Sequence, residues 1–156
     1  MAVQSYQRLD LAANQLETAI GLFISGRDRF SVITLAGAAD GILSQLVIDK
    51  GEANFIEFSL QKDDDKTLTR STLGAQVNDI LRINELKHMD EDDDGYVVMD
   101  IEECALATIL KAIANFVILR GHVDFVRAFL AWVKLNLDPK IYNIDCDPDW
   151  KPSTGS

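Results

Sequence analysis

The sequence predicts a single all-α domain. Apolar residues recur at three- and four-residue spacing through most of the chain, and no stretch alternates between apolar and polar residues as a strand does. The length of 156 residues suits one hydrophobic core and not two. We therefore expect an antiparallel up-and-down bundle of four long helices plus one or two short ones at 1–137. An extended, partly disordered C-terminal tail is expected at 138–156.

The first helix is predicted over residues 8–25 because apolar residues recur there at helical spacing. They are Leu9, Ala12, Ala13, Leu16, Ala19, Ile20 and Phe23. Gly26 is expected to end the helix, since glycine adopts the left-handed conformation of a C-terminal cap. Either Asp28 or Ser31 can then cap the next helix through a side-chain oxygen.

The second helix is predicted to close at Gly51 and to have a centre of unusually small residues. Residues 35–39 read Leu-Ala-Gly-Ala-Ala, and small residues let a neighbouring helix approach closely. We expect another helix to cross at this point. Asp40, in the same helix, can pair with an arginine or lysine of a neighbour. The segment 53–60 that follows fits either a short helix or an extended segment.

A further long helix is predicted from Ser71 to His88. On a continuous helix Asn84 and His88 share one face, because they are four residues apart, whereas Arg82 lies roughly 160° away from Asn84. We therefore expect Asn84 and His88 to point inward as a hydrogen-bonded polar pair. The Arg82 guanidinium is expected to face elsewhere.

The last two helices are predicted in the most apolar part of the chain. Residues 101–119 are apolar nearly all round, which is typical of a central helix. Asp100 and Glu103 form a capping box at its start, and Gly121 breaks it. The final helix is expected to end before Pro139.

Charge and composition predict a cytoplasmic protein that binds neither DNA nor membranes. The net charge of −10 repels polyanions, and the sequence has no cluster of lysines and arginines. Lys111 and Asn115 interrupt the most apolar run, and the N-terminus lacks a signal sequence. Cys104 and Cys146 are too few for a disulfide framework, and Cys104 is expected to be a buried thiol. No motif for a cofactor is present.

An acidic run at residues 90–95, Asp-Glu-Asp-Asp-Asp-Gly, copies the start of an EF-hand calcium loop. Such a loop needs a bidentate glutamate at its twelfth position. Here that position holds Ile101, and Glu102 follows one residue late. The other interpretation is a solvated turn whose acids favour the N-terminus of the next helix.

Arg82 and His88 are candidates for metal-independent cleavage of a phosphodiester. A histidine can move a proton while an arginine stabilises the charge that develops on the phosphate. The two side chains converge only if the helix ends or distorts near His88, or if a second subunit supplies one of them. The alternative is that Arg82 lies on the surface and His88 has a structural role.

The Arg82-x5-His88 arrangement, with the polar Asn84 between them, resembles the Arg-x4-6-His motif of HEPN domains. The small-residue segment 30–43 is similar to the early helix of that family. The run 84–88, with the acidic run after it, resembles uncharacterised bacterial proteins with this bundle. The similarity covers roughly residues 8 to 137.

The resemblance implies a helical bundle that dimerises and places Arg82 and His88 of both subunits in one cleft, with Asn84 in support. Many HEPN proteins are metal-independent endoribonucleases of toxin–antitoxin or phage-defence systems, and others are non-catalytic binding or assembly modules. The family commonly has its polar residue directly after the arginine, where this chain has Ile83.

Our first hypothesis is a dimeric binding or regulatory module without catalysis, because the acidic run beside His88 repels RNA. Its expected partners are a second copy and another protein. The dimer is expected because the small stripe 36–39 and the apolar last helix offer more hydrophobic surface than one bundle buries. The second hypothesis is an endoribonuclease that uses Arg82, Asn84 and His88 on RNA. The third is calcium binding by the acidic run.

Overall fold

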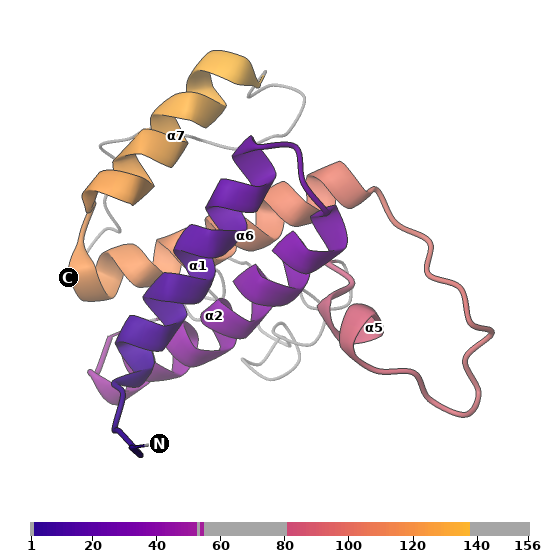
Figure 1. The fold of residues 1–156 in the computed structure, drawn as a ribbon, viewed down its shortest axis with the longest axis horizontal. Helices are drawn as coiled ribbons and strands as arrows, with labels where there is room; N and C mark the ends of the chain where they lie inside the picture. The colour runs from indigo at the N-terminus through magenta and orange to yellow at the C-terminus, as the bar shows by residue number, and fades with distance from the viewer. Residues whose placement is uncertain (1, 53, 55–80, 138–156) are drawn as a thin grey trace, which may run out of the picture.

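The computed structural model describes residues 2–52, 54 and 81–137. Within these residues the chain forms helices and no strand, which confirms the all-α class. The described helices are α1 (Arg8–Ile24), α2 (Arg29–Asp49), α5 (Ile83–Lys87), α6 (Ile101–Arg120) and α7 (Asp124–Asn136) (Figure 1). The predicted segment 53–60, most of the predicted helix that starts at Ser71, and the tail lie outside the described residues, Asn54 excepted.

Helices α1 and α2 form a hairpin, and the turn between them contains the predicted capping residues. Gly26 has a φ of 69°, in the left-handed region. Asp28 is the N-cap of α2, since its carboxylate accepts from the backbone N–H groups of Phe30 and Ser31, both at 3.2 Å. The Ser31 hydroxyl also donates to this carboxylate and thereby lowers the pKa of Asp28. Ser31 therefore assists the cap and does not form it.

Helix α6 is the central helix, as its apolar character predicts. It crosses behind α1 and α2 and packs against both (Figure 1). Asp100 caps its start by accepting from the Glu103 N–H at 3.0 Å, and Gly121 ends it with a φ of 72°. Cys104 is buried in α6, and desolvation raises the pKa of its thiol. The prediction of a buried thiol is confirmed, whereas Cys146 lies outside the described residues.

Helix α7 is attached to the core through aromatic side chains. Phe129 is fully buried, and its ring meets that of Phe23 edge to face at 6.0 Å between centroids. Trp132 stacks on Phe129 at 6.3 Å and also meets Phe23 edge to face at 5.9 Å. Because such geometries add to the burial of apolar area, these three rings fix the position of α7.

The small centre of α2 admits a close neighbour, as predicted. Ile83 of α5 lies against Gly37, so that a Cβ atom added to Gly37 would come within 2.9 Å of the Ile83 Cγ2 atom. Ala36 and Ala39 beside it are fully buried. The stripe is thus covered largely within one copy of the chain. It does not supply the exposed apolar surface on which the expectation of a dimer was partly based.

A pair of glycine variants in α2 tests this close approach. Gly41→Ala is expected to stabilise the protein by about 0.5–1 kcal/mol, because alanine favours a helix and nothing lies within 4 Å of the added Cβ. Gly37→Ala gains the same propensity but displaces Ile83, and overpacking costs about 1–3 kcal/mol. Denaturant unfolding should therefore rank Gly41→Ala as clearly the more stable variant. Equal stabilities would show that Ile83 does not press on Gly37.

One described helix, α2, is long and apolar enough to cross a membrane when judged by length and composition alone. Core helices of soluble proteins pass the same test, and the inner face of α2 is buried by α1 and α6.

Candidate functional site

A turn at Arg82 comes directly before α5, so the predicted continuous helix up to His88 is wrong. Residues 81 and 82 form a turn, and Arg82 has a φ of 58° and a ψ of 22°, in the left-handed region. The physical reason is burial: Leu81 and Ile83 are 7% and 4% exposed. On a regular helix residues two apart point roughly 160° away from each other, so they could not both reach the core.

The expectation that Asn84 and His88 form an inward polar pair is also wrong. Both residues are exposed, whereas Ile83 is buried and Leu86 is half-buried. Helix α5 is only five residues long and ends where the His88 N–H donates to the Asn84 carbonyl at 3.0 Å. His88 itself is extended, with a φ of −133° and a ψ of 150°. Its ring lies at the start of a loop that leaves the bundle.

The Arg82 guanidinium is paired with a carboxylate close to it in the sequence. Its Nη1 atom lies 2.7 Å from Oε1 of Glu85, and both side chains are partly exposed. In the described part of the chain no hydrogen bond or ion pair joins Arg82 to His88. The two candidate catalytic residues are therefore near in sequence, but Arg82 contacts Glu85 and not His88.

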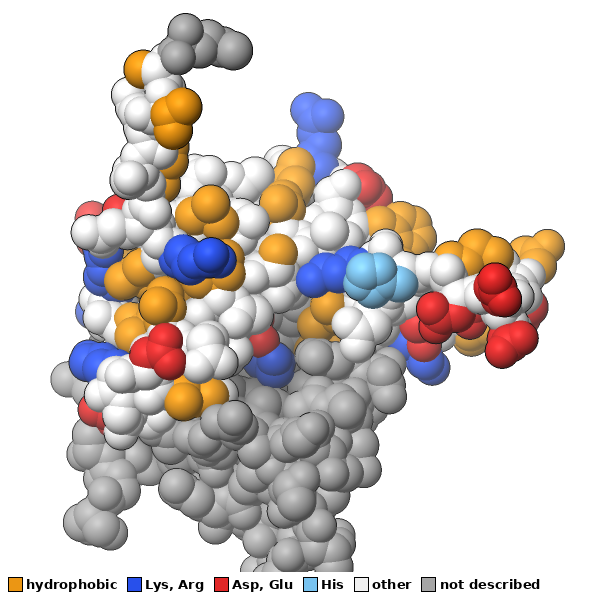
Figure 2. All heavy atoms as spheres, turned by 90° about the horizontal axis from the view of Figure 1, so that it is seen from below, with side chains coloured by type: hydrophobic (Ala, Val, Ile, Leu, Met, Phe, Trp, Pro, Cys, Tyr) orange, Lys and Arg blue, Asp and Glu red, His pale blue; other side chains and the backbone are white. Residues whose placement is uncertain are grey.

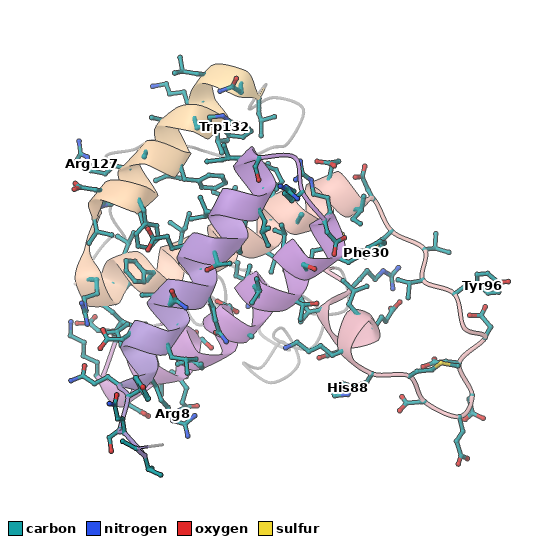
Figure 3. All side chains as sticks on the ribbon, viewed as in Figure 1. Arg8, Phe30, His88, Tyr96, Arg127 and Trp132 are labelled. Carbon is teal, nitrogen blue, oxygen red and sulfur yellow. The ribbon has the colours of Figure 1, made fainter. Side chains whose placement is uncertain are left out.

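The loop from residue 88 to residue 100, called here the projecting loop, extends away from the helices (Figure 1). Figure 3 shows His88 at the end of α5 and Tyr96 further along this loop. A cavity of about 120 Å³ lies at its base, between α5 and the loop. It is lined by Glu85, His88, Met89, Asp93, Gly95, Tyr96 and Val97.

The projecting loop carries a block of acidic side chains with apolar side chains before and after it, and Figure 2 shows both kinds gathered on one protruding part of the surface. The acidic block is residues 90–94, all exposed. Met89, Tyr96 and Val98 are 72%, 83% and 84% exposed. An acidic surface attracts cations and repels phosphates, and its apolar residues favour contact with another molecule.

Two of the five acids at residues 90–94 accept hydrogen bonds from the loop backbone. Oδ2 of Asp93 accepts from the Asp90 N–H at 2.7 Å, and Oδ1 of Asp94 accepts from the Tyr96 N–H at 2.9 Å. Gly95 has the positive φ of 84° that an EF-hand turn would need at this place. However, Glu102 pairs with Arg29 of α2 at 2.9 Å and 3.0 Å, which directs it away from the loop. Among the described residues no three histidine, cysteine or acidic side chains gather as a metal site would require.

A second polar cluster lies inside the bundle, between α2 and α6. Asp40 forms an ion pair with Lys111, and Nδ2 of Asn115 donates to its other oxygen at 2.7 Å. The three residues are 4%, 8% and 1% exposed. The predicted pairing of Asp40 with a cation is confirmed. The bonds of this cluster join α2 to α6 and hold the two helices in register. Because the cluster is closed off from solvent, it is not accessible to a ligand.

Comparison of the chain with protein-family models, with curated proteins and with solved structures finds no match in any of the three. By its fold and its site, the chain is an all-α domain that carries an acidic and apolar loop beside a small cavity.

Proposed function

We propose that the chain is a non-catalytic binding or regulatory module, built as a HEPN-like antiparallel bundle that forms a homodimer in the cytoplasm. The observation that best supports the non-catalytic role is the ion pair between Arg82 and Glu85 beside the cavity that His88 lines.

Cleavage of RNA would require the opposite electrostatics. The arginine must face the phosphate to stabilise its developing charge, and the histidine must exchange a proton with the reacting oxygen. Here Glu85 engages the Arg82 guanidinium and also lines the same cavity as His88, together with Asp93. A phosphodiester that enters would meet two carboxylates. The net charge of −10 adds to this repulsion.

One observation favours the runner-up, a metal-independent endoribonuclease. The helix ends at His88, and the side chains of Arg82, Asn84 and His88 all reach solvent. A second subunit or a bound RNA that displaced Glu85 would complete such a site.

Incubation of the purified protein with mixed RNA in EDTA separates the two functions. We expect no cleavage above the level of a buffer control, for the native chain and for His88→Ala alike, because the carboxylates exclude the substrate. Cleavage by the native chain that is lost in both His88→Ala and Arg82→Ala would replace the binding module by the ribonuclease. Glu85→Gln serves as the matched variant, since under the runner-up it frees Arg82 and raises cleavage.

The homodimer is tested by its mass in solution. Small-angle scattering or sedimentation should report twice the chain mass of 17.3 kDa. A particle with the mass of one chain at every concentration would reject the dimer. The role as a binding module would then still be decided by the RNA experiment.

A further inference from the structure

We propose that the cavity between α5 and the projecting loop binds the side chain of an arginine or lysine from a protein partner. This inference rests on the proposed function as a binding module, and it names the ligand group and the place where it binds. Three properties of the cavity carry it: its apolar wall, its two carboxylates and its size.

The apolar wall suits the stem of a long cationic side chain. Met89, Tyr96 and Val97 line one part of the cavity. Lysine and arginine lay their methylene groups along apolar surface while the charged head reaches a polar environment. Tyr96 also brings an aromatic ring into the lining, and the face of such a ring attracts a cation. A volume of about 120 Å³ has room for one such side chain.

The two carboxylates supply acceptors for the charged head. Glu85 uses Oε1 for Arg82, and Asp93 uses Oδ2 for the Asp90 N–H. The second oxygen of each carboxylate receives no hydrogen bond from the described residues and remains an acceptor. Hydrogen bonds between a carboxylate and a guanidinium or ammonium are stronger than neutral ones, and a planar guanidinium can bridge two oxygens.

The surroundings favour a basic protein segment over a free cation. Residues 90–94 extend the negative potential beyond the cavity, which steers a positively charged chain toward it. Met89 and Val98 are largely exposed, so a bound segment can cover apolar area next to the cavity. Among the described residues no three histidine, cysteine or acidic side chains gather as a metal ion would need, and a metal ion would also leave this apolar area in water.

The probe for this site is N-acetyl-arginine methylamide, with N-acetyl-glutamine methylamide as the neutral control. Two-dimensional amide NMR of the full labelled chain should show shifts that saturate in the millimolar range at Glu85, His88 and Tyr96. The glutamine compound should leave these resonances unchanged. Shifts that never saturate, or no shifts at all, would overturn the proposal.

Two neighbouring variants distinguish the cavity from general attraction to an acidic surface. Asp93→Asn removes a charge from the cavity lining and is expected to weaken binding about ten-fold, while its amide oxygen can still accept from the Asp90 N–H. Asp92→Asn removes the same charge one residue away, outside the lining, and should change the affinity less than about two-fold. Equal weakening in both would overturn the proposal. Neither result bears on the mass in solution or on the cleavage of RNA, so failure here leaves the proposed function standing.

Discussion

Replacement of Lys111 by methionine is expected to lower the free energy of unfolding by about 3–5 kcal/mol, the usual cost of removing one partner of a buried ion pair. The Asp40 carboxylate is only 4% exposed and would keep Asn115 as its hydrogen-bond donor while losing its counter-ion. Methionine fills nearly the same space as the lysine stem, so little of the loss comes from a cavity. Urea unfolding followed by circular dichroism measures the change.

The control for Lys111→Met is the double variant Asp40→Asn/Lys111→Met. It removes both charges and keeps an oxygen that can accept from Asn115, so most of the lost stability should return. If the double variant is as unstable as the single one, the loss comes from packing and not from the uncompensated charge.

Replacement of Phe129 by alanine is expected to cost about 3–5 kcal/mol, as is usual for a fully buried aromatic residue. The ring is 0% exposed and contacts both Phe23 and Trp132, so its removal opens a cavity where α7 meets the core. Urea unfolding gives the size of the loss. The near-ultraviolet dichroism of Trp132 should weaken in the folded variant, because its stacking partner is gone.

Leu135→Ala is the matched variant on the same helix. Leu135 is 85% exposed, so its truncation should change the stability by less than about 0.5 kcal/mol. Similar losses in both variants would mean that α7 is held by its overall helicity and not by the aromatic contacts.

The helices that depend on local signals could be predicted from the sequence. Two glycines end helices through their backbone freedom: Gly26 follows α1 and Gly121 follows α6. Two aspartates begin helices through side-chain hydrogen bonds: Asp28 caps α2 and Asp100 caps α6. The central place of α6 follows from its apolar character alone. These features need no knowledge of what lies beside them.

The break at Arg82 could not be predicted, because its cause lies elsewhere in the fold. Arginine has no preference for the left-handed region, and the turn exists because Leu81 and Ile83 are both buried, with Ile83 against Gly37 of α2. The sequence signal was the pair of apolar residues that flank Arg82. Helical periodicity favours a continuous helix instead, and a continuous helix would turn Asn84 and His88 inward.

The buried cluster was only half predictable for a similar reason. Asp40 in α2, and Lys111 with Asn115 in α6, each interrupt an apolar helix, and each interruption is visible in the sequence. The pairing of these three side chains depends on how α2 crosses α6, and the two helices are far apart in the sequence. The cavity by the projecting loop depends in the same way on the path of the backbone after α5.

Both ends of the projecting loop are fastened to a single helix. Ile83, shortly before the loop, rests on Gly37 at the middle of α2, and Glu102, just after it, is tied to Arg29 at the first turn of α2. Between fixed ends, the entropy of a chain changes only with the logarithm of its length. Residues can thus be inserted or exchanged at the tip of the loop at little thermodynamic cost, while the helices at its base stay as they are.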